Sequence, residues 1–345
     1  MLIARAPVRI SFAGGGTDLP AYYSQYGGAV VSTSIDKYFY VFLNVSADDA
    51  IQITSSDYRT FYRHDADTPM LFDGDLSLPR AILNHFGLTR GISMFLASEI
   101  PPGTGLGSSS TVAVAIIKAV TTARGLMLSK QQIAELACHI EIEKLNEPIG
   151  KQDQYAAAFG GLNLIQFTTD RVTVEPLNIT PETRRQLEKN ILLFFTGATR
   201  AASSILREQK KSSEQKDQHV LEAHHAVKAM AFEVKDYLEH GDLVSFGKLL
   251  DRAWQNKKKF AAGVSNPLID ECYALALENG ALGGKITGAG GGGFLMIYCE
   301  PPFQAAVTQA LESKGLRRMD FRFETEGARV LVNAGVRIAG SSYAA

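Results

Sequence analysis

Residues 101–111 combine three glycines with a run of serines, a composition suited to binding an anionic group. Glycine lets the backbone adopt left-handed conformations and lets a ligand lie against the main chain. The serines predict a capped helix start, where unpaired N–H groups and the helix dipole favour phosphate. A serine-capped helix behind a flexible turn, without a ligand, is the structural alternative. The candidate phosphate-binding residues are Pro102, Gly103, Gly105, Leu106, Gly107, Ser108, Ser109 and Ser110.

Two standard phosphate-binding loops do not fit this run. A Walker A loop has Lys and then Ser or Thr after its last glycine, whereas three serines follow Gly107. The dinucleotide fingerprint needs Gly-x-Gly-x-x-Gly, and the spacing of the three glycines is different. A second glycine-rich run at residues 288–293 does satisfy that fingerprint, but a strand rather than a helix is predicted after it. Neither run is therefore interpreted as a dinucleotide site.

Two carboxylates in the middle of the chain are candidates for metal binding and proton transfer. Glu141 lies near the end of a predicted helix, and Asp153 follows it within Gly-x-x-Asp-Gln at residues 150–154. Glu143 is two residues from Glu141, so on a helix it points elsewhere. The structural alternatives are an exposed helical carboxylate for Glu141 and a helix N-cap for Asp153.

A further polar group lies near the N-terminus, where a predicted strand runs into three consecutive glycines. Arg9 belongs to that strand, and the glycines are followed by Thr17 and Asp18. The glycines allow a sharp turn and a close approach to a ligand. A tight strand-to-helix connection with Asp18 as the helix N-cap is the alternative.

Apolar periodicity and turn residues predict the elements that must position these groups. A strand at 92–98 should feed the phosphate loop, and Ser129 should cap a helix from 130 to about 146. Further strands are predicted at 2–12, 39–45, 191–195, 294–299, 320–324 and 328–332, hairpins at 51–63 and 160–177, and helices at 78–86 and 303–314.

Composition excludes several classes of function. The 345 residues carry a net charge of −1, which argues against a nucleic-acid or acidic-membrane partner. The cysteines Cys138, Cys272 and Cys299 lack metal-site spacing and are interpreted as reduced core residues. No signal peptide or membrane-spanning run is found, so we expect a soluble cytoplasmic protein. The sequence does not determine the oligomeric state.

Three motifs in order resemble the GHMP small-molecule kinases, the family of galactokinase, homoserine kinase and mevalonate kinase. They are Ala-Pro-Val-Arg-Ile-Ser-Phe-Ala-Gly-Gly-Gly-Thr-Asp at 6–18, Pro-Pro-Gly-Thr-Gly-Leu-Gly-Ser-Ser-Ser at 101–110 and Lys-Ile-Thr-Gly-Ala-Gly-Gly-Gly-Gly at 285–293. The resemblance covers essentially the whole chain. It implies two α+β domains, at 1–182 and 183–345, with the active site in the cleft between them.

The resemblance also implies ATP and Mg²⁺ as cofactors and assigns roles to the candidate residues. The glycine-rich run would hold the nucleotide phosphates, and Ser109 and Glu141 would hold Mg²⁺. Asp153 would orient and deprotonate the acceptor hydroxyl, and Arg9 would orient Asp153 or neutralise charge. Because phosphoryl transfer depends mainly on positioning and charge neutralisation, the positioning role of Asp153 is the firmer one.

The acceptor is expected to be a sugar or sugar phosphate. Galactokinases carry Gly-Glu-His-Thr-Asp where this chain has Gly-Gly-Gly-Thr-Asp, which argues against galactose. The chain is similar instead to the branch of heptose 7-phosphate kinases and fucokinase relatives. Heptose 7-phosphate, phosphorylated at its anomeric hydroxyl, is the implied substrate. A free sugar such as fucose, a mevalonate-type substrate and a non-catalytic sensor are the alternatives. The implied substrate residues are Gly15, Gly16, Thr17, Asp18, Gly288 and Gly290, with Arg200 proposed for the phosphate.

Overall fold

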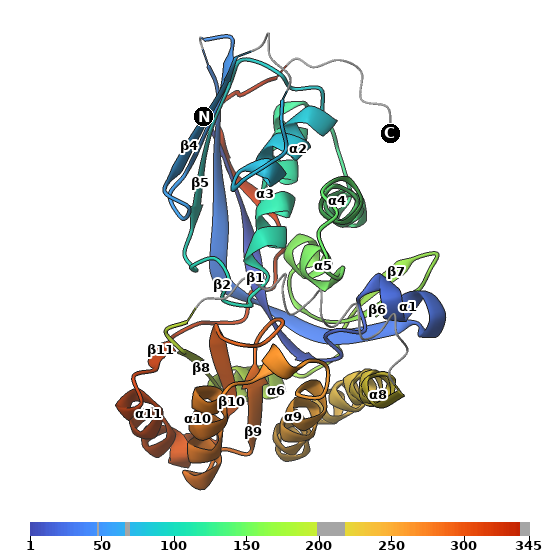
Figure 1. The fold of residues 1–345 in the computed structure, drawn as a ribbon, viewed down its shortest axis with the longest axis vertical. Coiled ribbons are helices and arrows are strands. Elements are labelled where there is room, and N and C mark those ends of the chain that lie inside the picture. The colour runs from blue at the N-terminus through green and yellow to red at the C-terminus, as the bar shows by residue number, and fades with distance from the viewer. Residues whose placement is uncertain (47, 66–69, 199–217, 339–345) are drawn as a thin grey trace.

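The computed structural model describes residues 1–46, 48–65, 70–198 and 218–338, and its strands form two sheets (Figure 1). The larger sheet has eight strands and the smaller has four. Helices pack on both sheets, which confirms the predicted α+β class. In the described part of the chain, none of the helices has the length and apolar character needed to cross a membrane.

The larger sheet is organised around one long strand, β2 (Gly28–Val45). Its first half pairs with β6 and its second half with β5, so β2 runs through both parts of the sheet. The strand order is β12-β1-β2-β5-β3-β4, with β6 also pairing with β7. The other strands are β1 (Leu2–Ala13), β3 (Ala50–Ser55), β4 (Thr60–Asp65), β5 (Ile92–Ser98), β6 (Leu162–Phe167), β7 (Val172–Pro176) and β12 (Arg329–Asn333). The predicted hairpins at 51–63 and 160–177 are confirmed.

Four helices cover one face of this sheet and bury an apolar core against it (Figure 1). They are α2 (Ser77–His85), α3 (Ser108–Ala123), α4 (Lys130–Cys138) and α5 (Gln152–Phe159). The predicted cap of α4 is confirmed, since the Ser129 side chain accepts a hydrogen bond from the Gln132 N–H in a capping box. The serine cap predicted for α3 is wrong. Its N-cap is Gly107, in a left-handed conformation, and the three serines form the first helical turn.

The second half of the chain builds the smaller sheet, in the antiparallel order β11-β8-β10-β9. Its strands are β8 (Ile191–Phe195), β9 (Gly283–Ile286), β10 (Phe294–Tyr298) and β11 (Arg317–Met319). The accompanying helices are α6 (Pro181–Asn190), α8 (Gln218–His240), α9 (Leu243–Lys257), α10 (Pro267–Glu278) and α11 (Gln304–Ser313). The short helix α1 (Pro20–Tyr26) follows β1, and 3₁₀ turns lie at Ala262–Val264 and Pro301–Phe303.

Two predicted strands near the C-terminus have different outcomes. The strand at 328–332 exists as β12, and it pairs with β1 in the larger sheet rather than staying with the second half of the chain. The strand at 320–324 is wrong, because only an isolated bridge between Phe323 and Ile35 forms there. The domain division at residue 182 stays a prediction.

The two sheets share one apolar core, in which Phe246 of α9 is fully buried. Its ring packs edge-on against Phe12 of β1, at 5.2 Å between centroids, and against Tyr298 of β10, at 5.5 Å. We expect this core to couple the two sheets and so to position the loops that join them.

Replacing Phe246 by Ala should therefore lower the free energy of unfolding by about 3–5 kcal/mol, because it leaves a cavity between the two sheets. Urea denaturation measures the change. Val244 on the same helix is 42% exposed, so Val244→Ala is the control and should change stability by less than about 0.5 kcal/mol. A similar loss in both variants would contradict the proposed coupling of the sheets through Phe246.

Candidate active site

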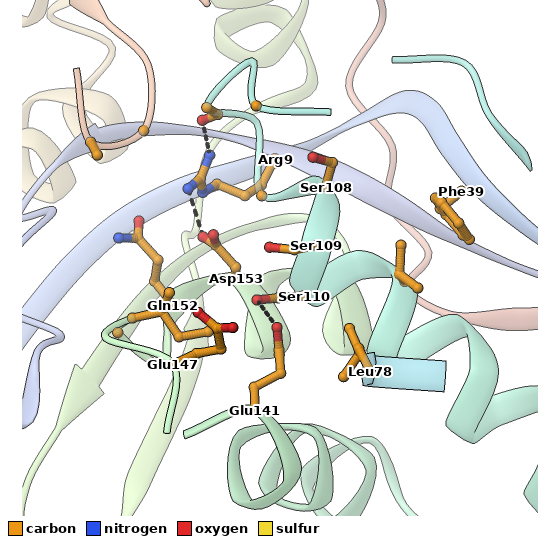
Figure 2. A pocket seen from close by; sticks show the side chains of 18 of the residues that line it. Arg9, Phe39, Leu78, Ser108, Ser109, Ser110, Glu141, Glu147, Gln152 and Asp153 are labelled. Carbon is orange, nitrogen blue, oxygen red and sulfur yellow. Dashed lines mark hydrogen bonds and ion pairs between the residues drawn. The ribbon is translucent and has the colours of Figure 1, made fainter. Parts of the chain in front are cut away.

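A cavity of about 420 Å³ lies where loops from both halves of the chain meet (Figure 2). Its polar wall is formed by Arg9, Ser11, Gly15, Gly16, Asp18, Gly103, Gly105, Gly107, Ser108, Ser109, Ser110, Glu141, Gln152, Asp153, Lys257, Lys285 and Gly288. The apolar part of the wall includes Phe39, Leu76, Leu78, Leu96 and Val112. The cavity thus gathers residues from all three sequence motifs.

The glycine-rich loop has the conformation that a phosphate-binding loop requires. Gly103, Gly105 and Gly107 have φ angles of 75°, 77° and 80°, values that favour glycine. A Cβ at Gly105 would lie 2.6 Å from the carbonyl oxygen of Thr287, so the loop also packs too closely on the second glycine run for a side chain. Because Gly107 precedes α3 directly, the N–H groups of the first helical turn have no partner within the helix and can bind an anion.

Arg9 ties the candidate base to this loop. Its Nη2 lies 2.6 Å from Oδ1 of Asp153, and its Nη1 donates to the carbonyl oxygen of Gly105 at 2.7 Å (Figure 2). The Arg9 side chain is buried, whereas Asp153 is 24% exposed and reaches the cavity. Burial raises the pKa of Asp153, and the guanidinium of Arg9 opposes that rise. A carboxylate with a raised pKa accepts a proton more readily, as a general base must.

Glu141 is a buried carboxylate on the cavity wall. It belongs to a π-helical turn, His139–Lys144, that continues α4 in place of the predicted α-helix, a feature common at functional sites. Its Oε1 accepts from the Ser110 hydroxyl at 3.0 Å, and its Oε2 accepts from Nε2 of Gln154 at 2.7 Å. Glu143 points away as expected, and its exposed side chain contacts His139 at 2.7 Å.

The oxygen donors at Glu141 fit a hard cation that takes its remaining ligands from the phosphates of a nucleotide. Burial raises the pKa of Glu141 to about 8, so the site favours a positive charge beside the ionised carboxylate. Ser109 is exposed and lines the same cavity. Within the described residues there is no cluster of three or more His, Cys, Asp or Glu for a metal. Mg²⁺ suits such a sparse set because it is usually held by one or two side chains together with phosphate oxygens.

The raised pKa of Glu141 predicts how a Glu141→Gln variant changes stability with pH. The folded pKa of about 8 exceeds the ordinary value of 4.5, so the folded protein favours the protonated acid. In the ligand-free wild type, the neutral Glu141 side chain makes its full contribution to folding stability below about pH 4.5. That contribution is lost as the pH rises towards 8. Gln stays neutral, so the melting temperature of the variant relative to wild type should increase between pH 5 and pH 8. If the difference in melting temperature between the variant and the wild type does not change with pH, the pKa of Glu141 is not raised.

Asp18 lines the same cavity as Asp153, and hydrogen bonds hold its carboxylate in place. Its Oδ1 accepts from the Gly16 N–H at 2.9 Å, and its Oδ2 accepts from Nε2 of Gln152 at 3.1 Å. The N-cap alternative does not hold, since Leu19 is the N-cap of α1. Thr17 does not line the cavity, because its buried hydroxyl donates to the carbonyl oxygen of Gly14.

Four other predicted site residues lie away from the cavity wall or outside the described residues. Arg200 lies outside the described residues, so its role stays a prediction. Leu106 is in the shared apolar core, although its carbonyl oxygen accepts from the Arg9 N–H. A Cβ at Gly290 would meet the Val264 carbonyl oxygen at 2.5 Å, which places this glycine against the protein rather than the cavity. Pro102 is also not part of the wall.

Sequence reasoning missed four residues that the structure brings into or next to the site, namely Gln152, Gln154, Lys257 and Lys285. It predicted Ser110 as a phosphate-binding residue, but not its hydrogen bond to Glu141. The two glutamines flank Asp153 in the Gly-x-x-Asp-Gln motif, so their position was a usable signal. Lys257 opens a run of three lysines, a pattern typical of a solvated helix face. Its burial could not be read from the run itself.

Comparisons with known proteins match this chain to one family. Residues 77–161 match the family model for the GHMP kinases N terminal domain, and residues 234–315 match the GHMP kinases C terminal model. The D-glycero-alpha-D-manno-heptose 7-phosphate kinase of Campylobacter jejuni is 36% identical over 94% of this chain and 97% of its own length. The crystal structure of a D-glycero-D-manno-heptose 1-phosphate kinase from Bacteriodes thetaiotaomicron superposes with a TM-score of 0.81, at 30% identity, over 97% of this chain and 100% of that one. The L-fucokinase/L-fucose-1-P guanylyltransferase of Bacteroides fragilis is 29% identical over 88% of this chain, which spans 35% of that protein.

Proposed function

Since this chain belongs to the GHMP kinases, we propose that it transfers the terminal phosphoryl group of ATP to the anomeric hydroxyl of D-glycero-D-manno-heptose 7-phosphate. The product would be the 1,7-bisphosphate. The observation that carries the proposal is the convergence of the glycine-rich loop, Asp153 and Arg9 on one cavity. We place the active site in the cleft between the two domains, since residues of both halves line that cavity.

In this proposal each residue contributes binding, orientation or a proton position. Asp153 orients the acceptor hydroxyl and accepts its proton at a carboxylate oxygen. Arg9 holds Asp153 in place against the Gly105 carbonyl and adds positive charge where negative charge develops. Because the transferred phosphoryl group needs little covalent help from the protein, this positioning carries most of the catalysis.

The nucleotide and its metal would occupy the same wall. Main-chain N–H groups of residues 105–109 would hold the phosphates, and the apolar part of the cavity, with Phe39, Leu78 and Leu96, suits a planar base. Ser109 and Glu141 would hold Mg²⁺. The cation, when bound, neutralises phosphate charge.

The acceptor would lie on the side of Asp18 and Gln152, whose polar groups can bind sugar hydroxyls. The names of the two heptose-kinase relatives place the existing phosphate differently, at the 7-position in one and the 1-position in the other. The weaker fucokinase match leaves a free sugar as the second candidate.

ADP release with a panel of substrates tests the proposal. The panel contains heptose 7-phosphate, heptose 1-phosphate, free heptose, fucose, galactose and mevalonate, each with ATP and Mg²⁺. We expect turnover with heptose 7-phosphate and little with the free sugars. Preference for free fucose would replace the proposal with a fucokinase-like function. Sugar binding without ADP release from any acceptor would favour a sensor.

A further inference from the structure

Two lysines from the second half of the chain are buried at the wall of the cavity. Lys257, at the end of α9, is 6% exposed, and Lys285, in β9, is 3% exposed. Lysine is almost never fully buried unless it is paired. The Nζ of Lys257 donates to the carbonyl oxygen of Gly288, and that of Lys285 donates to the carbonyl oxygen of Phe12 at 3.2 Å. An ammonium group has three N–H donors, so one carbonyl satisfies only part of each.

Asp153 and Asp18, two carboxylates of the cavity wall, bind other partners than these lysines. Asp153 pairs with Arg9, and Asp18 accepts hydrogen bonds from Gly16 and Gln152. Among the described residues, neither lysine forms an ion pair with a carboxylate within 4.0 Å. A buried ammonium without a counter-charge is costly, and a bound anion would remove that cost.

The pKa shifts agree with this lack of counter-charge. Burial lowers the pKa of Lys257 to about 7, with a further contribution from Arg9 that Asp18 opposes. Burial, Lys257 and Arg9 together lower the pKa of Lys285 well below its usual range. Three basic side chains therefore crowd one wall of the cavity, and a bound anion would favour the charged form of the two lysines.

The position of Lys257 indicates which kind of anion would bind. Its acceptor, Gly288, packs on the phosphate loop so closely that a Cβ there would lie 2.4 Å from the α-carbon of Gly105. Arg9 donates to the carbonyl oxygen of that same Gly105. Lys257 and Arg9 thus approach the contact between the two glycine loops, beside the candidate acceptor residues.

We propose that Lys257, with Lys285 behind it, forms a subsite for a phosphate dianion on the second-half wall of the cavity. This inference rests on the proposed function and deepens it, because it assigns a residue to an anionic group of a substrate. The phosphate has two sources, the sugar's own phosphate group or the terminal phosphate of the nucleotide. Lysine binds either as a compact point charge with rotatable donors.

Calorimetric titration of Lys257→Met distinguishes the sources. One arm uses heptose 7-phosphate, and the other uses a non-hydrolysable ATP analogue with Mg²⁺. Loss of one charge-assisted contact should weaken binding in one arm by about 10- to 100-fold. Weakening confined to the sugar phosphate assigns the subsite to the sugar, and weakening of the analogue assigns it to the nucleotide.

Lys259→Met is the matched control, since Lys259 is exposed and donates to Oδ1 of Asn256 at 3.3 Å. Less than a threefold change in both arms for Lys257→Met, or an equal change in the control, overturns the subsite. If the Met variant does not fold, Lys257→Gln replaces it, because Gln keeps an N–H donor for Gly288 without the charge. If the wild-type protein binds the ATP analogue but not heptose 7-phosphate, the proposed substrate is wrong. The titration with the analogue then still tests whether Lys257 binds a nucleotide phosphate.

Discussion

Replacing Asp153 by Asn should lower kcat by about 10²- to 10⁴-fold and leave the affinity for a non-hydrolysable ATP analogue unchanged. The carboxylate lies 2.6 Å from Arg9 and reaches the cavity from the start of α5. Asn keeps the size of the side chain but neither accepts the acceptor's proton nor balances the guanidinium. Steady-state kinetics with heptose 7-phosphate and calorimetry with the analogue separate the two effects.

The Asp153 substitution leaves Arg9 buried without its partner, so thermal melts must accompany the kinetics. Asp170→Asn, at an exposed position between β6 and β7, is the control and should keep wild-type turnover. A loss of less than tenfold in kcat, about 1.4 kcal/mol, would remove Asp153 from the mechanism.

The second large effect is expected at the proposed metal site. Glu141→Gln should raise the Mg²⁺ concentration for half-maximal activity by about 100-fold or more, because even indirect partners of a metal are worth 10–100-fold in affinity. Glu143→Gln is the matched control, since Glu143 is two residues away and exposed, and it should change little. If the two substitutions behave in the opposite way, Glu143 rather than Glu141 holds the cation.

The serines of α3 allow a finer test of the same site. Ser109 faces the cavity and is the predicted ligand, whereas the Ser110 hydroxyl donates to Glu141. Ser109→Ala combined with Glu141→Gln should therefore cost less than the sum of the two single effects on Mg²⁺ activation. A larger effect of Ser110→Ala than of Ser109→Ala would move the ligand role to Ser110.

The sequence alone determined the elements whose signals are local. Ser129 and Gln132 stand three residues apart, as a capping box requires, and they begin α4. Stretches rich in β-branched and aromatic residues predicted β1 and the hairpins, and the glycine spacing predicted a loop whose three glycines have positive φ angles. The order of the three motifs indicated the family, because each motif is a contiguous stretch.

Tertiary structure alone decided which side chains meet and which are buried. Arg9 reaches a carbonyl 96 positions away at Gly105, and β12 returns to β1 across nearly the whole chain. Lys257 looks like its solvated neighbours in the sequence, but the packing of α9 against β9 buries it, and its Nζ donates to the carbonyl oxygen of Gly288. The free energy of such a residue depends on the charges and surfaces around it in the fold, which local sequence patterns do not encode.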